Sequence, residues 1–326
     1  MEKVLTISVA AYNIEKYIDQ LMDSIICSKK MDEIEVLIVN DGSKDKTAEI
    51  GQRYHEQYPG AVFLIDKENG GHGSTINEGI KRATGKFFKA IDGDDWVDSE
   101  GLKCLVEFLK TCETDLVITD FKNVYEETGR ESVRKCGLIP NKVYDFNQTE
   151  HLLDAVCYHN VVFRSSLLKN RNIALTEHSF YVDNELIAYP LPYVDTVVYC
   201  EALVYCYRLE REGQSVSLKS VQKNELQHLR IVDNLLKFYQ EKCVDLPDAK
   251  KKSIAEFISS VVVFQLNIQF SFPKSKERLH KLIEFDNQVK KTALIYQSMK
   301  NRTYRIWRKG RTLLYIPTWY WLQKKN

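Results

Sequence analysis

The sequence predicts an α/β protein in which a mostly parallel sheet is covered on both faces by helices and is followed by a helical region. Two observations lead to this fold class. In the first hundred residues, apolar runs of strand length alternate with segments whose apolar residues have helical spacing. After residue 217 only the helical spacing continues. Because strands joined by helices run parallel through right-handed crossovers, helices should lie on both faces of the sheet.

The composition is that of a globular protein and excludes several other classes. Of the 326 residues, 44% are hydrophobic and 28% are charged, and the net charge of +1 argues against nucleic acid as a partner. The eight cysteines contain no C-x-x-C pair and are expected to be reduced thiols. The chain begins without a basic-then-apolar signal region, and polar residues interrupt its most apolar late segment, 254–272. We therefore expect a cytoplasmic protein whose late apolar segment is a buried helix.

The first hundred residues are predicted to contain four strands with helices between them. Residues 4–11 form a β-branched, mostly apolar run, which is typical of a strand buried on both faces. The pairs Pro59-Gly60 and Thr84-Gly85 end helices. The predicted strands are 4–11, 34–39, 61–65 and 87–91, and the predicted helices are about 14–26, 46–58 and 75–83.

Polar loops follow all four predicted strands. They are Tyr12-Asn13, 40–43, 69–74 and 92–95. Because ligands bind at the carboxyl ends of the strands in such sheets, we expect these loops to converge on one edge. The last loop carries Asp92, Asp94 and Asp95, whose mutual repulsion is usually offset by a cation such as Mg²⁺ or Mn²⁺ that also holds a diphosphate. On this loop alone, a solvated acidic turn that caps the next helix is the alternative.

Four short motifs occur in order in this part of the chain. They are Ser-Val-Ala-Ala-Tyr-Asn at 8–13, Val-Asn-Asp-Gly-Ser at 39–43, Asn-Gly-Gly at 69–71 with Asn-Glu-Gly at 77–79, and Ile-Asp-Gly-Asp-Asp at 91–95. Their order and spacing resemble glycosyltransferase family 2, which has the GT-A fold with a Rossmann-like mixed sheet. The resemblance is close from residue 4 to about 100 and weaker to about 217. One departure is that Ala10 and Ala11 stand where the family often has proline before Tyr-Asn.

The resemblance implies a nucleotide-sugar donor. Asp41 would accept a hydrogen bond from a pyrimidine imide N–H. Asp92 and Asp94 match the family's D-x-D element, which would make them ligands of Mn²⁺ or Mg²⁺. The residues implied for nucleotide-sugar binding are Ala11, Tyr12, Asn13, Glu15, Asp41, Asn69, Gly71, Asp92, Gly93, Asp94 and Arg208.

Three further polar residues lie next to these motifs. Asp95 is expected to be either a metal ligand or a supporting partner of the other aspartates. His72 can reach a phosphate, but a histidine in a loop is more often a bystander. Lys89 is unusual inside a strand, and it is given no role beyond tuning the field at the aspartates.

After residue 100 the alternation weakens. The predicted elements are a helix at 101–111, a strand at 115–119, a polar, hairpin-like stretch to 143–144, and strands at 193–199 and 203–207. We therefore divide the expected GT-A domain, 1–217, into a nucleotide-sugar-binding half, 1–100, and an acceptor half, 101–217. Arg208 follows the last strand and resembles the basic residue of the family's Tyr-x-Arg segment. It would close over the diphosphate or form a structural salt bridge.

Asp183 is the predicted general base. An inverting transfer needs a group that takes the proton of the acceptor hydroxyl during attack on the anomeric carbon. The family usually has Glu-Asp at the start of a helix here, whereas this chain reads Val182-Asp183, so Asp183 is the matching carboxylate. The alternative role is an N-cap of a helix over 184–189, and both roles could hold together. Glu177 and Glu185 are the substitutes if Asp183 does not serve.

The last third of the chain is predicted to be helical and to end in a basic, aromatic tail. Apolar spacing predicts helices near 226–239, 249–270 and 274–296, within an expected helical domain at 218–299. Residues 300–326 contain eight Lys or Arg and no Asp or Glu, interleaved with Tyr and Trp. This composition suits contact with an anionic membrane surface, an oligomer contact, or a helix packed on the catalytic domain.

The whole sequence thus predicts a cytoplasmic, metal-dependent, inverting glycosyltransferase of family 2. It would transfer a sugar from a UDP-sugar to a glycan, lipid-linked or glycoprotein acceptor, at the inner face of the membrane if the tail binds there. The enzyme rival is a nucleotidylyltransferase, whose usual glycine-rich loop with a following Arg is replaced here by residues 11–15. The other rival is a non-catalytic scaffold or binding protein that kept the fold.

Overall fold

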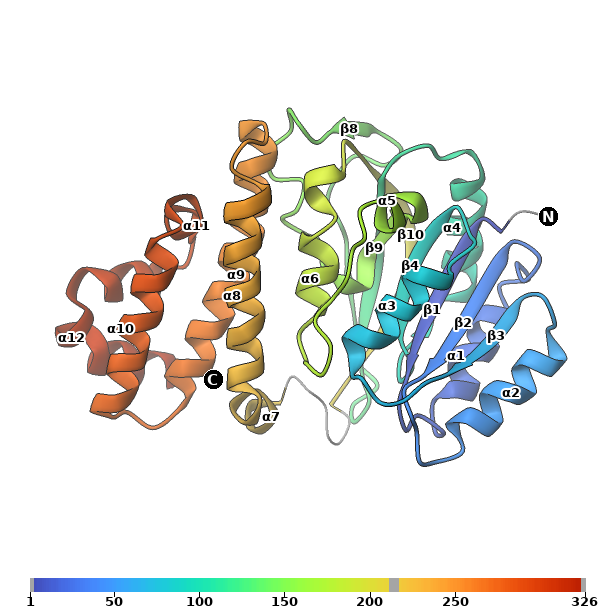
Figure 1. The fold of residues 1–326 in the computed structure, drawn as a ribbon, viewed down its shortest axis with the longest axis horizontal. Coiled ribbons are helices and arrows are strands. Elements are labelled where there is room, and N and C mark those ends of the chain that lie inside the picture. Colours follow the sequence, from blue (N-terminus) through green and yellow to red (C-terminus); the bar gives the residue numbers. More distant parts are fainter. Residues whose placement is uncertain (1–2, 211–216, 324–326) are drawn as a thin grey trace. The chain divides into compact units, whose positions relative to one another are not determined.

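The protein forms two compact units, Met1–Glu212 and Gly213–Asn326. The structure, a computed structural model, describes residues 3–210 and 217–323. In these residues the first unit contains a mixed sheet with helices, and the second contains helices alone (Figure 1). The α/β fold class with a C-terminal helical region is confirmed. The division comes after residue 212, whereas the sequence analysis placed it after 217.

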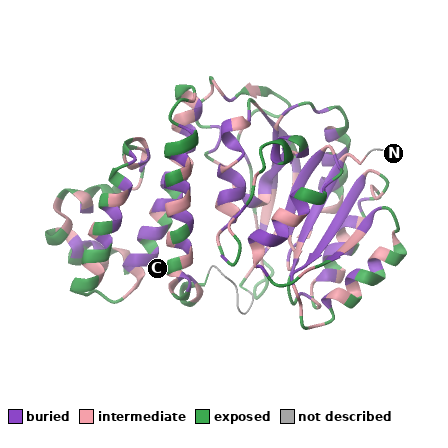
Figure 2. Ribbon diagram, in the orientation of Figure 1, coloured by how far each residue is buried: buried purple, intermediate pink, exposed green. Residues whose placement is uncertain are grey.

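The first four strands form where the sequence predicts them, and most element ends agree within one or two residues. The elements are β1 (Leu5–Ala11), α1 (Ile18–Ile26), β2 (Ile34–Asn40), α2 (Thr47–Gln57), β3 (Val62–Asp66), α3 (His72–Arg82) and β4 (Phe87–Asp92). One difference matters for the site: α3 begins at His72 and not at Thr75, so its first turn replaces part of the predicted loop. The side chains of β1 and β2 are almost all buried on both faces, as Figure 2 shows in purple.

The order of these strands explains the two helical layers. The strand order is β3-β2-β1-β4, and all three pairs are parallel. The chain moves outward from β1 to β3 and then returns past β1 to β4. Right-handed crossovers therefore place α3 on the face opposite to α1 and α2. α1 contacts α2 and α4 (Ser99–Thr111), whereas α3 contacts α5 (Ser165–Asn170).

The sheet continues beyond β4 with antiparallel and parallel neighbours. The order is β4-β9-β6-β10-β5, with β7 on β6 and β8 on β10. The further elements are β5 (Trp96–Val97), β6 (Leu116–Tyr125), β7 (Glu131–Arg134), β8 (Val143–Asp145), the 3-10 turn η1 (Tyr158–Asn160), β9 (Val161–Arg164), α6 (Asp183–Ala188), the 3-10 turn η2 (Leu191–Tyr193) and β10 (Thr196–Leu209). β10 corrects the prediction of two strands at 193–199 and 203–207. Shifts of register between Tyr199 and Tyr205 let one strand follow β6 throughout.

The second unit is a group of helices around α9. Its elements are α7 (Leu218–Lys223), α8 (Glu225–Lys242), α9 (Asp248–Ser271), α10 (Lys276–Lys290), α11 (Ala293–Ser298) and α12 (Arg302–Gln323). α9 contacts each of the other five. The single helix predicted at 274–296 is instead α10 and α11, because Thr292 has non-helical backbone angles between them.

By length and composition alone, α9 could cross a membrane. However, 67% of its most apolar window is buried within the structure, as in the central helix of a bundle. Gln265 of α9 lies on the buried side, where its Oε1 is 2.6 Å from His228 Nδ1 of α8. These contacts agree with the buried helix that the sequence analysis expects here.

The expected tail at 300–326 is not a separate segment, because α12 packs on α9 and α10 as part of the second unit. Trp307 and Tyr304 are fully buried, and both lie against Phe270 of α9. Asp286 of α10 is also fully buried, and it pairs with Arg308 at 2.6 Å. Several of the basic and aromatic side chains of 300–326, among them Trp307, Tyr304 and Arg308, therefore pack within the helical unit.

Candidate active site

The carboxyl ends of β1 to β4 lie side by side. In the register of the sheet, Ala11 pairs with Asn40, Ala10 with Asp92, and Asn40 with Asp66. The loops that follow these strands therefore start from one edge, which confirms the predicted convergence.

The loop after β1 is fastened to the loop after β2. The Asn13 N–H donates to Ser43 Oγ at 3.0 Å, and Asn13 Oδ1 accepts the Lys44 N–H at 2.8 Å. The Glu15 N–H donates to Asp45 Oδ2 at 3.0 Å, and Glu15 Oε2 accepts the Lys46 N–H at 2.9 Å. The Tyr12 side chain is 51% exposed, so its ring is accessible at this edge. Asn13 and Glu15 thus shape the loop, and Tyr12 is the side chain that can meet a base.

Asp41 is a buried carboxylate that holds the glycine-containing loop after β3. Its Oδ1 accepts the Gly70 N–H at 2.9 Å, and its Oδ2 accepts the Gly71 N–H at 2.8 Å. Lys67 Nζ lies 2.7 Å from Oδ1 and balances the charge. The Asn69 side chain donates to the Asp41 carbonyl at 2.9 Å. A pyrimidine imide at Asp41 would share the carboxylate with these donors.

The acidic turn after β4 folds back against β1. The Gly93 N–H donates to the Ala10 carbonyl at 3.0 Å. A Cβ atom on Gly93 would lie 2.8 Å from the Ala10 carbonyl oxygen, a backbone atom of β1, so the approach requires glycine. Ala11 is buried at the end of β1, and its carbonyl accepts the Asp41 N–H at 2.8 Å. Both Gly93 and Ala11 therefore contribute through their backbone.

Asp92 lies between a tyrosine and a histidine from other elements. Tyr158 of η1 donates its hydroxyl to Asp92 Oδ1 at 3.0 Å, and His72 Nε2 lies 3.0 Å from the same oxygen. Burial opposes both charges, but their mutual attraction outweighs it: the pKa of Asp92 is lowered and the pKa of His72 is raised. The pair is therefore a carboxylate beside a ring that favours the imidazolium form.

Asp95 supports the turn from behind. It is 2% exposed, and it accepts the Tyr205 hydroxyl at 2.6 Å and the Arg208 N–H at 2.7 Å. Burial, together with the charges of Asp94 and Asp92, raises the pKa of Asp95 well above its ordinary value. Because both oxygens are engaged with β10, these contacts favour the supporting role over the ligand role.

Arg208 has the structural salt bridge that was one of its two predicted roles. Its Nη1 lies 2.9 Å from Glu126 Oε1, and its Nε donates to the Asp94 carbonyl at 2.8 Å. The guanidinium also lies 4.8 Å from the centres of two aromatic rings. Arg208 thus fixes the backbone at Asp94, and contact with a diphosphate stays a prediction.

Asp183 is the first residue of α6, and its charge interacts with those of His72 and Asp92. Burial raises the pKa of Asp183 to about 6, with His72 opposing the shift and Asp92 adding to it. Val182 precedes the helix, so the alternative role of Asp183 as an N-cap is wrong: its carboxylate belongs to the first turn. A carboxylate with this pKa is ionised at neutral pH yet basic enough to take a proton.

Residues 175–179, which we call the strap, lead to α6 and lie on the glycine-containing loop. The His178 N–H donates to the Gly70 carbonyl at 2.6 Å. A Cβ atom on Gly73 would lie 2.1 Å from the Thr176 carbonyl oxygen, so α3 and the strap approach as closely as glycine allows. The chain that carries the candidate base is thus in direct contact with the candidate donor loop.

Two side chains hold the strap from either side. Asn77 donates to the Leu175 carbonyl at 3.0 Å and accepts the Leu175 N–H at 2.7 Å. Glu185, which is fully buried, accepts the Thr176 N–H at 2.7 Å and the Thr176 hydroxyl at 2.8 Å. Glu177 is exposed on the strap. Of the three acidic residues considered as a base, Asp183 is the one coupled to the acidic turn.

The residues of this edge suit a divalent cation. The charges of Asp92 and Asp94 raise the pKa of Asp95, and that of Asp92 raises the pKa of Asp183. A bound cation would remove this repulsion, and carboxylates are the ligands that Mg²⁺ and Mn²⁺ prefer. Among the described residues, Asp92, Asp95 and His159 bring ligand atoms within 4.8 Å of one another. Since Asp95 is engaged with β10, we retain Asp92 with Asp94 as the candidate ligands.

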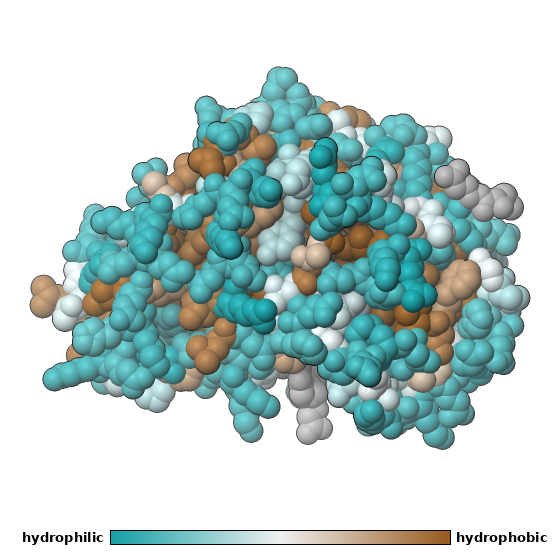
Figure 3. All heavy atoms as spheres, in the orientation of Figure 1, coloured by the Kyte–Doolittle hydropathy of each residue, from teal (hydrophilic) through white to brown (hydrophobic). Residues whose placement is uncertain are grey.

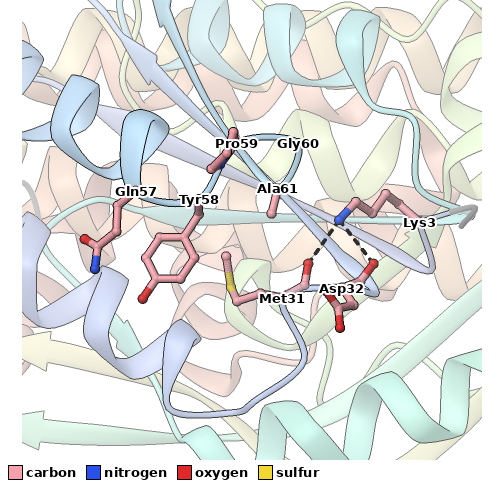
Figure 4. A pocket seen from close by; sticks show the side chains of 8 residues that line it. All are labelled: Lys3, Met31, Asp32, Gln57, Tyr58, Pro59, Gly60 and Ala61. Carbon is pink, nitrogen blue, oxygen red and sulfur yellow. Dashed lines mark hydrogen bonds between the residues drawn. The ribbon is translucent and has the colours of Figure 1, made fainter.

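A separate hollow of about 450 Å³ opens at the amino ends of the strands (Figure 4). It is lined by Lys3, Met31, Asp32 and residues 57–61. The Lys3 ammonium donates to the carbonyls of Met31 and Asp32 at 3.0 and 3.1 Å. None of the predicted site residues lines it.

Comparison with known proteins identifies the family. Residues 6–171 match the family model described as glycosyl transferase family 2. The chain belongs to glycosyltransferase family 2. Among similar proteins, the putative glycosyltransferase EpsH of Bacillus subtilis is 29% identical over 258 residues, which cover 78% of this chain and 69% of EpsH.

Another relative of this family 2 glycosyltransferase is TarS of Staphylococcus aureus, a poly(ribitol-phosphate) β-N-acetylglucosaminyltransferase. It is 27% identical over 286 residues, which cover 83% of this chain and 45% of TarS. This chain thus matches less than half the length of TarS.

Solved structures show the same fold. A crystal structure of S. aureus TarS 1–349 in complex with UDP-GlcNAc has a TM-score of 0.64 at 20% identity, covering 98% of this chain and 90% of that chain. The mannosyltransferase PcManGT of Pyrobaculum calidifontis, in complex with GDP-Man and Mn²⁺, has a TM-score of 0.53 at 14% identity, covering 98% and 86%. These similarities confirm the GT-A fold of the glycosyltransferase.

Sequence reasoning missed two tyrosines of the site and misjudged one histidine. Tyr158 and Tyr205 donate to Asp92 and Asp95 from 66 and 110 residues away. No motif in the sequence signals such contacts. His72, expected to be a bystander, lies 3.0 Å from Asp92 because α3 begins early and turns it toward β4.

Lys89 has a structural partner that its position could have signalled. A lysine within an apolar strand must find acceptors, because an unpaired buried charge is costly. Its Nζ donates to the His159 carbonyl at 2.7 Å, and burial lowers the pKa of Lys89 to about 7. Lys89 thus anchors η1, which carries Tyr158.

Proposed function

We propose that this glycosyltransferase moves a sugar from a UDP-sugar to a hydroxyl group of a glycan-type acceptor, with inversion at the anomeric carbon. Asp183 serves as the general base, and Asp92 and Asp94 hold Mn²⁺ or Mg²⁺. The observation that carries the proposal is the state of Asp183. Burial raises its pKa to about 6, and its charge is coupled to Asp92 and His72 at the carboxyl edge of the sheet.

In the proposed reaction one bond forms as another breaks. The acceptor oxygen bonds to the anomeric carbon while the bond from that carbon to the diphosphate oxygen breaks, and UDP leaves with the electron pair. Asp183 takes the proton of the acceptor hydroxyl. A divalent cation at Asp92 and Asp94 would neutralise the charge that develops on the diphosphate. Tyr158 and His72 hold Asp92 in place for this role.

The donor site is the set of loops at the same edge. The exposed ring of Tyr12 is available to stack on the base, and Asp41 accepts from its imide. The backbone of 69–71 is held for a ligand by Asp41. UDP-GlcNAc is the first donor to test, because a TarS structure contains it.

The acceptor is a glycan or a glycan-like polymer, free, lipid-linked or on a protein. Relatives named for such products support this class, including the TarS enzyme and the chondroitin synthase of Escherichia coli, which is 25% identical over 242 residues. The enzyme works in the cytoplasm, where nucleotide sugars are made, and meets a lipid-linked acceptor at the inner face of the membrane.

The test compares Asp94→Asn and Asp183→Asn with Glu177→Gln, an exposed acidic residue on the strap. UDP- and GDP-sugars are screened for hydrolysis and transfer with Mn²⁺, and UDP binding is measured by calorimetry. Asp94→Asn should lose metal-dependent UDP binding. Asp183→Asn should keep UDP binding and lose roughly 100-fold or more in turnover. Glu177→Gln should behave like the wild type.

Folding is checked in the same variants. An ionised carboxylate with a raised pKa opposes folding at neutral pH, so Asp183→Asn should melt no lower than the wild type. Wild-type turnover by both aspartate variants would refute the mechanism. If no UDP- or GDP-sugar binds, the proposed donor is wrong.

A further inference from the structure

The two units carry opposite charge. Residues 1–212 contain 24 Lys or Arg and 36 Asp or Glu, whereas residues 213–326 contain 22 and 9. The formal charges are therefore −12 for the catalytic unit and +13 for the helical unit, and they nearly cancel in the net charge of +1. A strong asymmetry of this kind points to an anionic partner for the basic part.

The first half of α12 presents cations on its exposed side. Arg302, Arg305 and Lys309 are exposed, together with Ile306. They recur at spacings of three and four residues, so they share one helical face. Tyr304 lies on the opposite, buried side.

The second half of α12 presents apolar side chains instead. Leu313 is 85% exposed, and Ile316 and Tyr320 are each 51% exposed. These three are again spaced by three and four residues, and Tyr315 and Thr318 lie on the buried side. Arg311, with φ 24° and ψ −90°, kinks the helix between the two halves.

We call Arg302, Arg305, Lys309, Leu313, Ile316 and Tyr320 the α12 surface. It does not resemble an ordinary solvated helix face. A large aliphatic side chain that is 85% exposed costs free energy in water unless a partner covers it. Figure 3 shows brown, hydrophobic surface among the helices of this unit. Lys274 adds a further cation beside this surface. Its Nζ lies 4.1 Å from the ring centre of Tyr320.

We propose that the α12 surface docks the protein on a membrane that contains anionic lipids. Arg302, Arg305 and Lys309 contact lipid phosphates, and Leu313, Ile316 and Tyr320 enter the interface between head groups and acyl chains. A soluble polyanion would match the cations but leave the apolar half uncovered. A second copy of the protein that docked through its own helical unit would place a formal charge of +13 against +13, and the two units would repel each other. The proposal is independent of the donor and of Asp183.

The test is co-sedimentation of the full chain with vesicles. Phosphatidylcholine vesicles are compared with vesicles of phosphatidylcholine and phosphatidylglycerol, at low and high salt. The charge variant is Arg302→Glu with Arg305→Glu and Lys309→Glu. The apolar variant is Leu313→Ser with Ile316→Ser. The wild type should bind the anionic vesicles and release them at high salt, and each variant should bind at least 10-fold more weakly.

Matched controls separate the α12 surface from net charge. Lys223, Arg230 and Lys237 are exposed on α7 and α8, and their change to Glu alters the net charge by the same amount. Leu226 of α8 is 75% exposed, and Leu226→Ser matches the loss of an exposed leucine. Both controls should keep most of the vesicle binding. Turnover of a UDP-sugar without vesicles should be unchanged in all four variants, which distinguishes loss of docking from loss of fold.

Three outcomes would overturn the proposal. The first is equal loss of binding in the charge variant and its control, which would make the effect one of net charge. The second is equal binding of the wild type to neutral and to anionic vesicles, which would show that lipid charge plays no part. The third is a dimer in sedimentation velocity that the apolar variant dissociates without any change in vesicle binding.

Discussion

At the scale of single residues, the candidate base depends on its surroundings more than on any one partner. Burial is the largest cause of the raised pKa of Asp183, and the attraction of His72 and the repulsion of Asp92 act in opposite directions. His72 is in turn tied to Asp92 at 3.0 Å. A change in the charge at Asp92, such as the binding of a cation, therefore reaches Asp183 without direct contact.

The pH dependence of turnover follows from this pKa. Asp183 must be ionised to accept a proton, so kcat/KM should fall about tenfold per pH unit below about pH 6. The measurement is a pH profile of sugar transfer with a donor that the screen of UDP- and GDP-sugars finds to be turned over. Glu177→Gln should keep the same acidic limb. If the acidic side of the pH profile gives an apparent pKa near that of a free aspartate, the group that controls turnover is not Asp183.

The sequence predicted the aspartates of the site better than it predicted their partners. Asp92, Asp94 and Asp183 stand at positions that match motifs of the family, and the roles proposed for them come from that resemblance. Tyr158 could not be inferred in this way, because its contact with Asp92 depends on how β9 and η1 are placed beside β4. Arg208 was left with two roles, and only the contacts with Glu126 and the Asp94 carbonyl define one of them.

At the scale of elements, the strap links the two halves of the site. It is bonded to the donor loop through His178 and to α3 through Asn77, and Glu185 connects it to α6. Few of these contacts involve residues that would touch a substrate. The strap therefore positions the base by its backbone.

Replacement of Asn77 tests this positioning. Asn77→Ala leaves the N–H and carbonyl of Leu175 without their side-chain partner, which should cost about 1–3 kcal/mol and lower Tm by several degrees. Turnover should fall more than UDP affinity, because the donor loop keeps its bonds to Asp41. Lys81→Ala is the control on the same helix, where the side chain is 75% exposed. Equal losses of UDP affinity and turnover would contradict a role through the strap.

Element prediction succeeded where local pattern and sheet order agree. β1 to β4 were found because each is an apolar run followed by a loop and a helix. β10 was divided into two strands because residues 200–202 interrupt its pattern, but pairing with β6 continues across the bulge. Composition suggested a separate tail at 300–326, but it could not reveal that Asp286 of α10 binds Arg308 and that Trp307 fills a core.

At the scale of the whole molecule, a near-neutral sum conceals two strongly charged parts. The net charge of +1 led the sequence analysis to argue against nucleic acid as a partner. Only the division after residue 212 reveals −12 and +13. Composition over a full chain is thus a poor guide when its domains differ in sign.

The charge division also leaves two units of strong and opposite charge in a protein with a pI of about 7.5. Near that pH, little net repulsion keeps two molecules apart, while the acidic unit of one attracts the basic unit of another. The protein should therefore form reversible clusters in dilute buffer. They should disperse as salt shortens the Debye length to about 10 Å at roughly 0.1 M. Light scattering along a salt gradient at neutral pH would measure this, and scattering independent of salt would contradict it.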